Sequence, residues 1–263
     1  MGYILDCETE TTTEASLAMA YRCNPEDIYR IFDSLDLNAI YESEESPTEK
    51  PGSFLSGQLC AALSEPELPE WICWFHFTRT SLSNDFGEGI LPLGKVLSRL
   101  WVQLIRTAPS SEVSKNLQAL RENGVPDFQY RLKAPCSMHW GPFGYLVPAI
   151  AEHAKELAQH DYLGMPEIIE DICNGYFESF GVQLYEHYGK LLKPCIVKFQ
   201  QLAGDRGEDA LEVACSYLYG CRKKERPSSS WITCFDGEGS VVPANSIISV
   251  RYIESSQNQT STT

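Results

Sequence analysis

A run of eight residues, Trp-Ile-Cys-Trp-Phe-His-Phe-Thr at 71–78, constrains the fold more than any other segment of the chain. Its aromatic and β-branched side chains are typical of a strand in the centre of a sheet. Side chains alternate between the two faces of a strand, so His76 and Thr78 are expected on one face and Phe75 and Phe77 on the other. A polar face at the end of a central strand can bind a ligand, although a half-buried structural histidine produces the same pattern.

The other segments mix helices and strands without regular alternation. Helix caps and apolar spacing predict helices at 24–35, 54–63, 96–105, 110–124, 148–158, 166–176 and 208–219. Apolar runs predict further strands at 128–132, 195–199, 231–235 and 246–253. This irregular order favours an α+β fold over a doubly wound parallel sheet.

Acidic residues are concentrated in the first 70 positions. This segment has 15 acidic and 3 basic side chains, a net charge of −12 out of −15 for all 263 residues. Such a surface repels phosphate backbones, which argues against a nucleic-acid binder, and it can guide association with a basic protein. We therefore expect an acidic, mainly helical region at 1–70, a main domain at 71–254 and a disordered tail at 255–263. The threonines at 9–13 are expected to lie in a segment without regular structure.

The ten cysteines are scattered through apolar segments, and no two of them have the Cys-x-x-Cys spacing of a structural zinc site. Cys136 and His139 form only a weak metal pair, so no metal site is expected. Cysteines of this kind are expected to be free thiols that act as small apolar packing residues. Cys73 and Cys234 are predicted to pack in this way beside the strands on which they lie.

The sequence also restricts where the chain is expected to act. No run of about 18 apolar residues could cross a membrane, and the N-terminus lacks the basic and apolar segments of a secretory signal. Free thiols belong in a reducing compartment. These features predict a cytoplasmic protein with no membrane partner.

Three short segments, in this order, carry the expected chemistry. The first starts with His-Phe-Thr-Arg at 76–79 and, after a polar loop, continues with Phe-Gly-Glu-Gly-Ile-Leu-Pro-Leu at 86–93. The second is Gly-Pro-Phe-Gly-Tyr-Leu-Val at 141–147, and the third is Asp-Gly-Glu-Gly-Ser-Val-Val-Pro at 236–243. Read singly, each has an ordinary structural meaning. Tyr145 can be a core aromatic residue, and Glu238 can lie in a turn with its carboxylate in water.

Together these segments resemble the ADP-ribosyltransferase superfamily, in its His-Tyr-Glu branch. Members of that branch have a strand with a His-x-Thr pair, then a Gly-x-Gly-Ile-Tyr segment, then an acid-x-Glu pair before the closing strands. The first segment is also similar to His-Phe-Thr segments of bacterial abortive-infection toxins. Phe143 departs from the family pattern, which has glycine there. The 69 positions between His76 and Tyr145 require an insertion at roughly 98–135.

The resemblance implies an α+β fold with a split antiparallel β core, two small sheets forming a cleft, and surrounding helices. It implies NAD as the substrate and a site in which His76 anchors the ribose, with Thr78 beside it. Tyr145 would stack on the nicotinamide, and Arg79 would contact the pyrophosphate. Glu238 would bind the ribose 2′-hydroxyl and stabilise the oxocarbenium ion as nicotinamide departs.

The expected function is therefore ADP-ribosyl transfer from NAD to a macromolecular acceptor such as a protein, in a bacterial toxin or phage-defence setting. Two alternatives remain open: a non-enzymatic protein of the inhibitor or immunity type that uses its acidic region to bind a basic partner, and an inactive transferase fold. The carboxylates of Glu167, Glu170 and Asp171 could also face a site, although this spacing is more typical of a solvated helix face.

Overall fold

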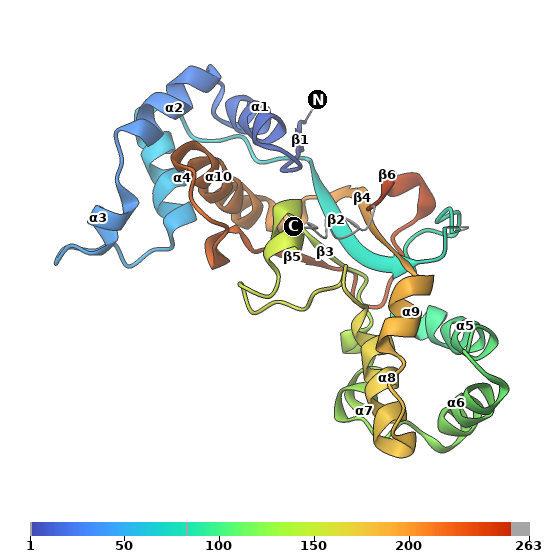
Figure 1. Cartoon of the computed structure of the whole chain (residues 1–263). Coiled ribbons are helices and arrows are strands. Elements are labelled where there is room, and N and C mark those ends of the chain that lie inside the picture. Colours follow the sequence, from blue (N-terminus) through green and yellow to red (C-terminus); the bar gives the residue numbers. More distant parts are fainter. Residues whose placement is uncertain (1, 83, 254–263) are drawn as a thin grey trace, which may run out of the picture. The chain divides into compact units, whose positions relative to one another are not determined.

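The computed structural model describes residues 2–82 and 84–253 (Figure 1). It contains helices and a six-stranded sheet, which confirms a mixed α+β composition. The chain divides into two compact units. The first comprises Met1–Phe75, Phe143–Gln159 and Lys198–Phe235, and the second comprises His76–Pro142, His160–Val197 and Asp236–Thr263. The acidic region at 1–70 thus belongs to the first unit together with two later segments, and the predicted tail at 255–263 lies outside the described residues.

The first unit is built around helix α10. Its helices are α1 (Glu10–Tyr21), α2 (Pro25–Asp33), α3 (Leu37–Tyr41), α4 (Pro51–Ala62) and α10 (Gly207–Lys223). Helix α10 is buried along most of its length and packs against α4 and α1 (Figure 1). The core of this unit includes Leu17 on α1, Phe32 on α2 and Leu55 on α4, all completely buried.

The second unit contains a cluster of helices: α5 (Leu93–Arg106), α6 (Ser111–Asn123), α7 (Phe128–Lys133), α8 (Glu167–Phe180) and α9 (Tyr185–Leu191). Their apolar faces share one core, which includes Trp101, Leu117, Ile172 and Tyr188. The amphipathic spacing read from the sequence therefore describes α5, α6 and α8 correctly.

The described strands form a single sheet, where the sequence led us to expect two small ones. The strands are β1 (Ile4–Leu5), β2 (Trp71–Thr80), β3 (Phe143–Tyr145), β4 (Lys193–Leu202), β5 (Cys234–Asp236) and β6 (Ile247–Tyr252). Their order is β5-β3-β2-β4-β6, and β1 pairs with β2. β2 is parallel to β1 and antiparallel to β3. The eight-residue run is thus a central strand, as predicted.

Two local predictions are wrong because a side-chain cap starts a helix. Residues 128–132 form helix α7 and not a strand, since Asp127 Oδ1 accepts a hydrogen bond from the Tyr130 amide at 2.7 Å. The threonines at 9–13 are ordered, since Thr9 and Thr12 form a capping box at the start of α1. A third difference is at 148–158, where a 3₁₀ helix, Pro148–His153, replaces the predicted α-helix.

Two helical glycines of the first unit provide a matched test of the packing. Alanine is intrinsically better than glycine in a helix by about 1 kcal/mol. A Cβ at Gly57 in α4 would meet nothing within 4 Å, whereas a Cβ at Gly220 in α10 would lie 2.3 Å from Cζ2 of Trp231. We expect Gly57→Ala to raise the free energy of unfolding by up to about 1 kcal/mol. Gly220→Ala should lower it by about 2 kcal/mol. Urea denaturation measures both, and equal stabilisation by the two variants would contradict the packing of α10 on Trp231.

Candidate functional site

The C-terminal half of β2 has the polar face that its sequence predicts. His76, Thr78 and Thr80 are half-buried, while Phe77 between them is buried. Thr80 Oγ1 accepts a hydrogen bond from Asn84 Nδ2 at 3.1 Å, so the polar face continues into the following loop. This face thus carries the imidazole of His76 and the hydroxyl groups of Thr78 and Thr80.

Arg79 lies on the other face of β2 and is used structurally. Its guanidinium donates to the carbonyl oxygens of Leu163 at 2.6 Å and Leu192 at 2.7 Å, and also to that of Gly189. Gly189 and Leu192 belong to the C-terminal end of α9, where carbonyl groups lack helical partners and favour a cation. Nη1 and Nη2, which would make the predicted pyrophosphate contact, already bind carbonyls of the chain, while Nε is buried without a hydrogen-bond partner among the described residues.

Tyr145 ends the short strand β3 and is only 8% exposed. Its hydroxyl donates to Oε1 of Gln159 at 3.2 Å. In the β2–β3 pair Tyr145 is the direct partner of Phe75. Directly opposed residues in antiparallel strands share a face, so alternation along β2 gives Tyr145 the face of Phe75 and not that of His76. In this structure the ring of Tyr145 is a core aromatic residue.

Glu238 lies in the turn that follows β5, and its side chain is exposed. Its φ of 51° is in the left-handed region, and its amide donates to Oδ1 of Asp236 at 2.8 Å. The neighbouring Gly237 and Gly239 amides donate to the carbonyls of Pro142 at 2.9 Å and Gly141 at 2.8 Å. This is the turn with a water-facing acid that the local sequence allows, and it leaves the carboxylate accessible to a ligand.

The three segments singled out from the sequence lie on neighbouring strands, although they are far apart along the chain. His76 is on β2, Tyr145 is on β3, and Glu238 follows β5, while the order of the sheet runs β5-β3-β2. The structure thus brings together the strands that carry these residues. It does not direct Tyr145 and His76 to one face.

The cysteines are all within the described residues, and all ten are free. Cys73 is 2% exposed and packs in the core as predicted, and burial raises its pKa to about 12. Cys234 on β5 is exposed, so its prediction as a packing residue is wrong. Its strand has three residues, and the alternation of so short a strand turns Cys234 outward while Phe235 is buried.

The sequence favoured a solvated helix face at Glu167 and Asp171, but both form ion pairs in the second unit. Lys133 Nζ lies 2.9 Å from both Oε2 of Glu167 and Oδ2 of Asp171, and Tyr162 donates to Oε1 of Glu167 at 3.0 Å. Burial raises the pKa of Asp171 to about 6, against the opposing effect of Lys133. The spacing of Glu167 and Asp171, four positions apart on α8, already placed them on one helix face. Their burial depends on α7, which the sequence did not predict.

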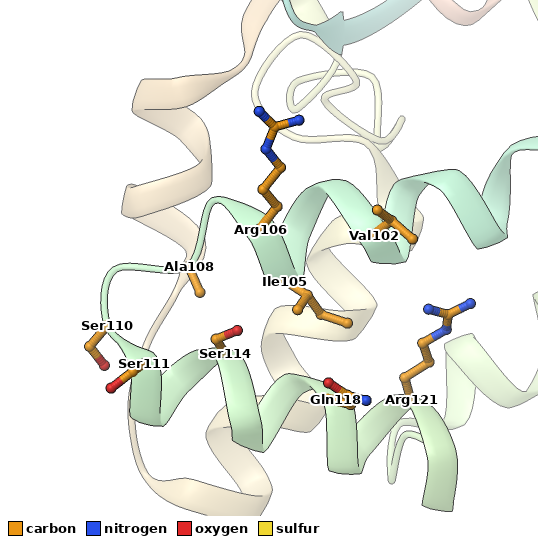
Figure 2. A pocket seen from close by; sticks show the side chains of 9 residues that line it. All are labelled: Val102, Ile105, Arg106, Ala108, Ser110, Ser111, Ser114, Gln118 and Arg121. Atoms are coloured by element: carbon orange, nitrogen blue, oxygen red, sulfur yellow. The ribbon is translucent and has the colours of Figure 1, made fainter.

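A shallow groove of about 510 Å³ lies between α5 and α6 (Figure 2). Figure 2 shows Ile105 from α5 and Ser114 from α6 pointing into the space between the two helices. Its lining residues are Val102, Ile105, Arg106, Ala108, Ser110, Ser111, Ser114, Gln118 and Arg121. None of the residues predicted from the sequence lines it, and its polar groups are spread along an open surface.

Comparison of the chain with known protein families, curated proteins and solved structures finds no match. Within the described ranges 2–82 and 84–253, no helix is both long and apolar enough to span a membrane. The same residues contain no group of three or more His, Cys, Asp or Glu side chains arranged to hold a metal ion.

Proposed function

We propose that the chain is an NAD-dependent ADP-ribosyltransferase that modifies a macromolecular acceptor, as a cytoplasmic toxin or phage-defence effector. One observation supports this most directly. His76 lies on β2, Tyr145 on β3 and Glu238 directly after β5, and the order of the sheet runs β5-β3-β2.

In the proposed reaction the bond between ribose C1′ and the nicotinamide nitrogen breaks, and its electron pair leaves with nicotinamide. A nucleophile of the acceptor then bonds to C1′ and loses its proton to solvent. The carboxylate of Glu238 stabilises the positive charge that develops on the ribose. His76 hydrogen-bonds the ribose. Tyr145 is buried on the Phe75 face of the sheet and not on that of His76, so neither it nor Arg79 has a direct role in the proposed reaction.

Replacement of Glu238 by glutamine tests the proposal, because it removes the charge and keeps the shape. With radiolabelled NAD, we expect the parent chain to release nicotinamide and Glu238→Gln to release it about 100-fold more slowly. Glu122→Gln, the same change at an exposed position on α6, should behave like the parent. Equal rates for Glu238→Gln and the parent would remove Glu238 from the mechanism. If the parent neither binds nor cleaves NAD, the enzymatic proposal fails.

A non-enzymatic function is the second candidate, and the acidic segment after α3 favours it. Helix α3 has no buried residue, and Glu42, Glu44, Glu45 and Glu49 are all exposed. Exposed charges of one sign speed association with a partner of the opposite sign and make it sensitive to salt. A parent chain inert toward NAD that binds a basic protein in a salt-dependent manner would point to this function.

A further inference from the structure

The turn that carries Glu238 is fixed to one short segment of the second unit, Trp140–Pro142. The amides of Gly237 and Gly239, on either side of Glu238, donate to the carbonyls of Pro142 and Gly141. The contact is close, since a Cβ on Gly237 would lie 2.7 Å from Cδ of Pro142. The exposed side chain of Glu238 has little packing of its own. The position of its carboxylate therefore depends on this backbone contact.

Trp140 holds that segment in place through three sets of contacts. Its indole Nε1 donates to the carbonyls of Lys133 at 3.2 Å and Ala134 at 3.3 Å, at the end of α7. Its own carbonyl accepts from the Leu93 amide at 3.0 Å, at the start of α5. Its ring lies so close to Gly94 that a Cβ there would approach to 2.3 Å. The indole is thus held between two helices, directly before the segment that binds the Glu238 turn.

The end of α7 that accepts the hydrogen bonds of Trp140 is itself held in place by ion pairs. Lys133, whose carbonyl accepts from Trp140, places its ammonium group 2.9 Å from the carboxylates of Glu167 and Asp171 on α8. The side chain of Lys133 is only 15% exposed, so this contact is well shielded from water. A continuous series of contacts therefore connects α8 and α7 through Trp140 to the Glu238 turn, all within the second unit.

We propose that Trp140 is a positioning residue for Glu238: its indole holds Gly141 and Pro142 where they bind the turn, and so sets the location of the carboxylate. The catalytic consequence rests on the proposed transferase function. A catalytic group must be held within a fraction of an ångström of its productive position by groups that are themselves fixed. Glu238 lies in an exposed turn, and the Trp140–Pro142 segment supplies this support from outside the turn.

The test compares Trp140→Phe with Trp101→Phe in the full chain. Trp101 is another tryptophan of the same unit, and it is buried where Trp140 is half-buried; its Nε1 donates a hydrogen bond to Tyr130 at 3.0 Å. Hydrogen exchange of the Gly237 and Gly239 amides reports the turn directly and needs no activity. We expect these two amides to exchange about tenfold faster in Trp140→Phe than in the parent. In Trp101→Phe they should exchange as in the parent.

Nicotinamide release from NAD gives the second readout. In Trp140→Phe we expect kcat to fall about tenfold with KM unchanged, while Trp101→Phe keeps both near the parent values. Unchanged amide exchange in Trp140→Phe, or an equal acceleration in both variants, would overturn the positioning role, as would faster exchange with unaltered kcat. If the parent does not cleave NAD, the transferase proposal fails by itself, and the amide exchange still decides whether Trp140 positions the turn.

Discussion

Replacing Lys198 by alanine is expected to lower the free energy of unfolding by about 3 kcal/mol. Lys198 lies on β4, is 9% exposed, and places Nζ 2.6 Å from Oδ2 of Asp6 and 2.7 Å from Oε2 of Glu8. Its removal leaves the partly exposed carboxylates of Asp6 and Glu8 close together without their shared counter-charge. Breaking a buried ion pair from one side costs far more than the intact pair contributes. Urea denaturation at neutral pH measures the loss.

A triple variant separates this cost from simple loss of packing. Lys198→Met combined with Asp6→Asn and Glu8→Gln removes all three charges and keeps most of the volume, so we expect it to recover much of the stability that the single variant loses. If Lys198→Ala alone stays within about 0.5 kcal/mol of the parent, the range of ordinary surface changes, the ion cluster does not hold β4 to the N-terminal segment.

The same cluster has a defined dependence on pH. Burial by itself lowers the pKa of Lys198, but its hydrogen bonds to Asp6 and Glu8 outweigh burial and hold the pKa above its ordinary value. A lysine pKa raised by folding contributes stability that is fully present below the unfolded value of about 10.4. That contribution is lost as the pH rises through the higher pKa of the folded state. The difference in stability between the parent and the triple variant should therefore shrink in alkaline solution.

The sequence predicts elements well where a signal is local. β2, β4 and β6 are apolar runs, and α2 begins at the predicted Asn24-Pro25 start. β1 has only two residues, too few for any periodicity, and it exists because it pairs with β2 some 67 positions later. The single sheet in place of two was missed for the same reason, since strand pairing is decided between distant segments.

The candidate site likewise has features that local sequence predicts and features that depend on distant segments. Local sequence indicated the polar face of His76 and Thr78 and the turn at Glu238, and both are present. It could not indicate which side chains are already engaged. Tyr145 lies on the Phe75 face because of the register in which β3 pairs with β2, and the carbonyls that bind Arg79 come from positions 163, 189 and 192. Residue type tells what a side chain can bind, and only the fold tells whether it is still available.

Replacing Arg79 tests whether its guanidinium serves the fold. We expect Arg79→Ala to lower the free energy of unfolding by about 4 kcal/mol. The variant removes all the hydrogen bonds from the guanidinium and leaves carbonyls of Leu163, Gly189 and Leu192 without a donor. Two of them are at the end of α9, which is seven residues long and depends on such contacts. Thermal and urea denaturation measure the effect.

Two variants make the result specific. Arg79→Lys keeps the charge but cannot span three carbonyls, so about half of the loss should remain. Arg106→Ala, at an exposed position on α5, should change stability by less than about 0.5 kcal/mol. The opposite pattern is also informative: an Arg79→Ala variant with unaltered unfolding and a raised KM for NAD would mean that the guanidinium binds the pyrophosphate after all. The contacts of Arg79 with the carbonyls would then have to break when NAD binds.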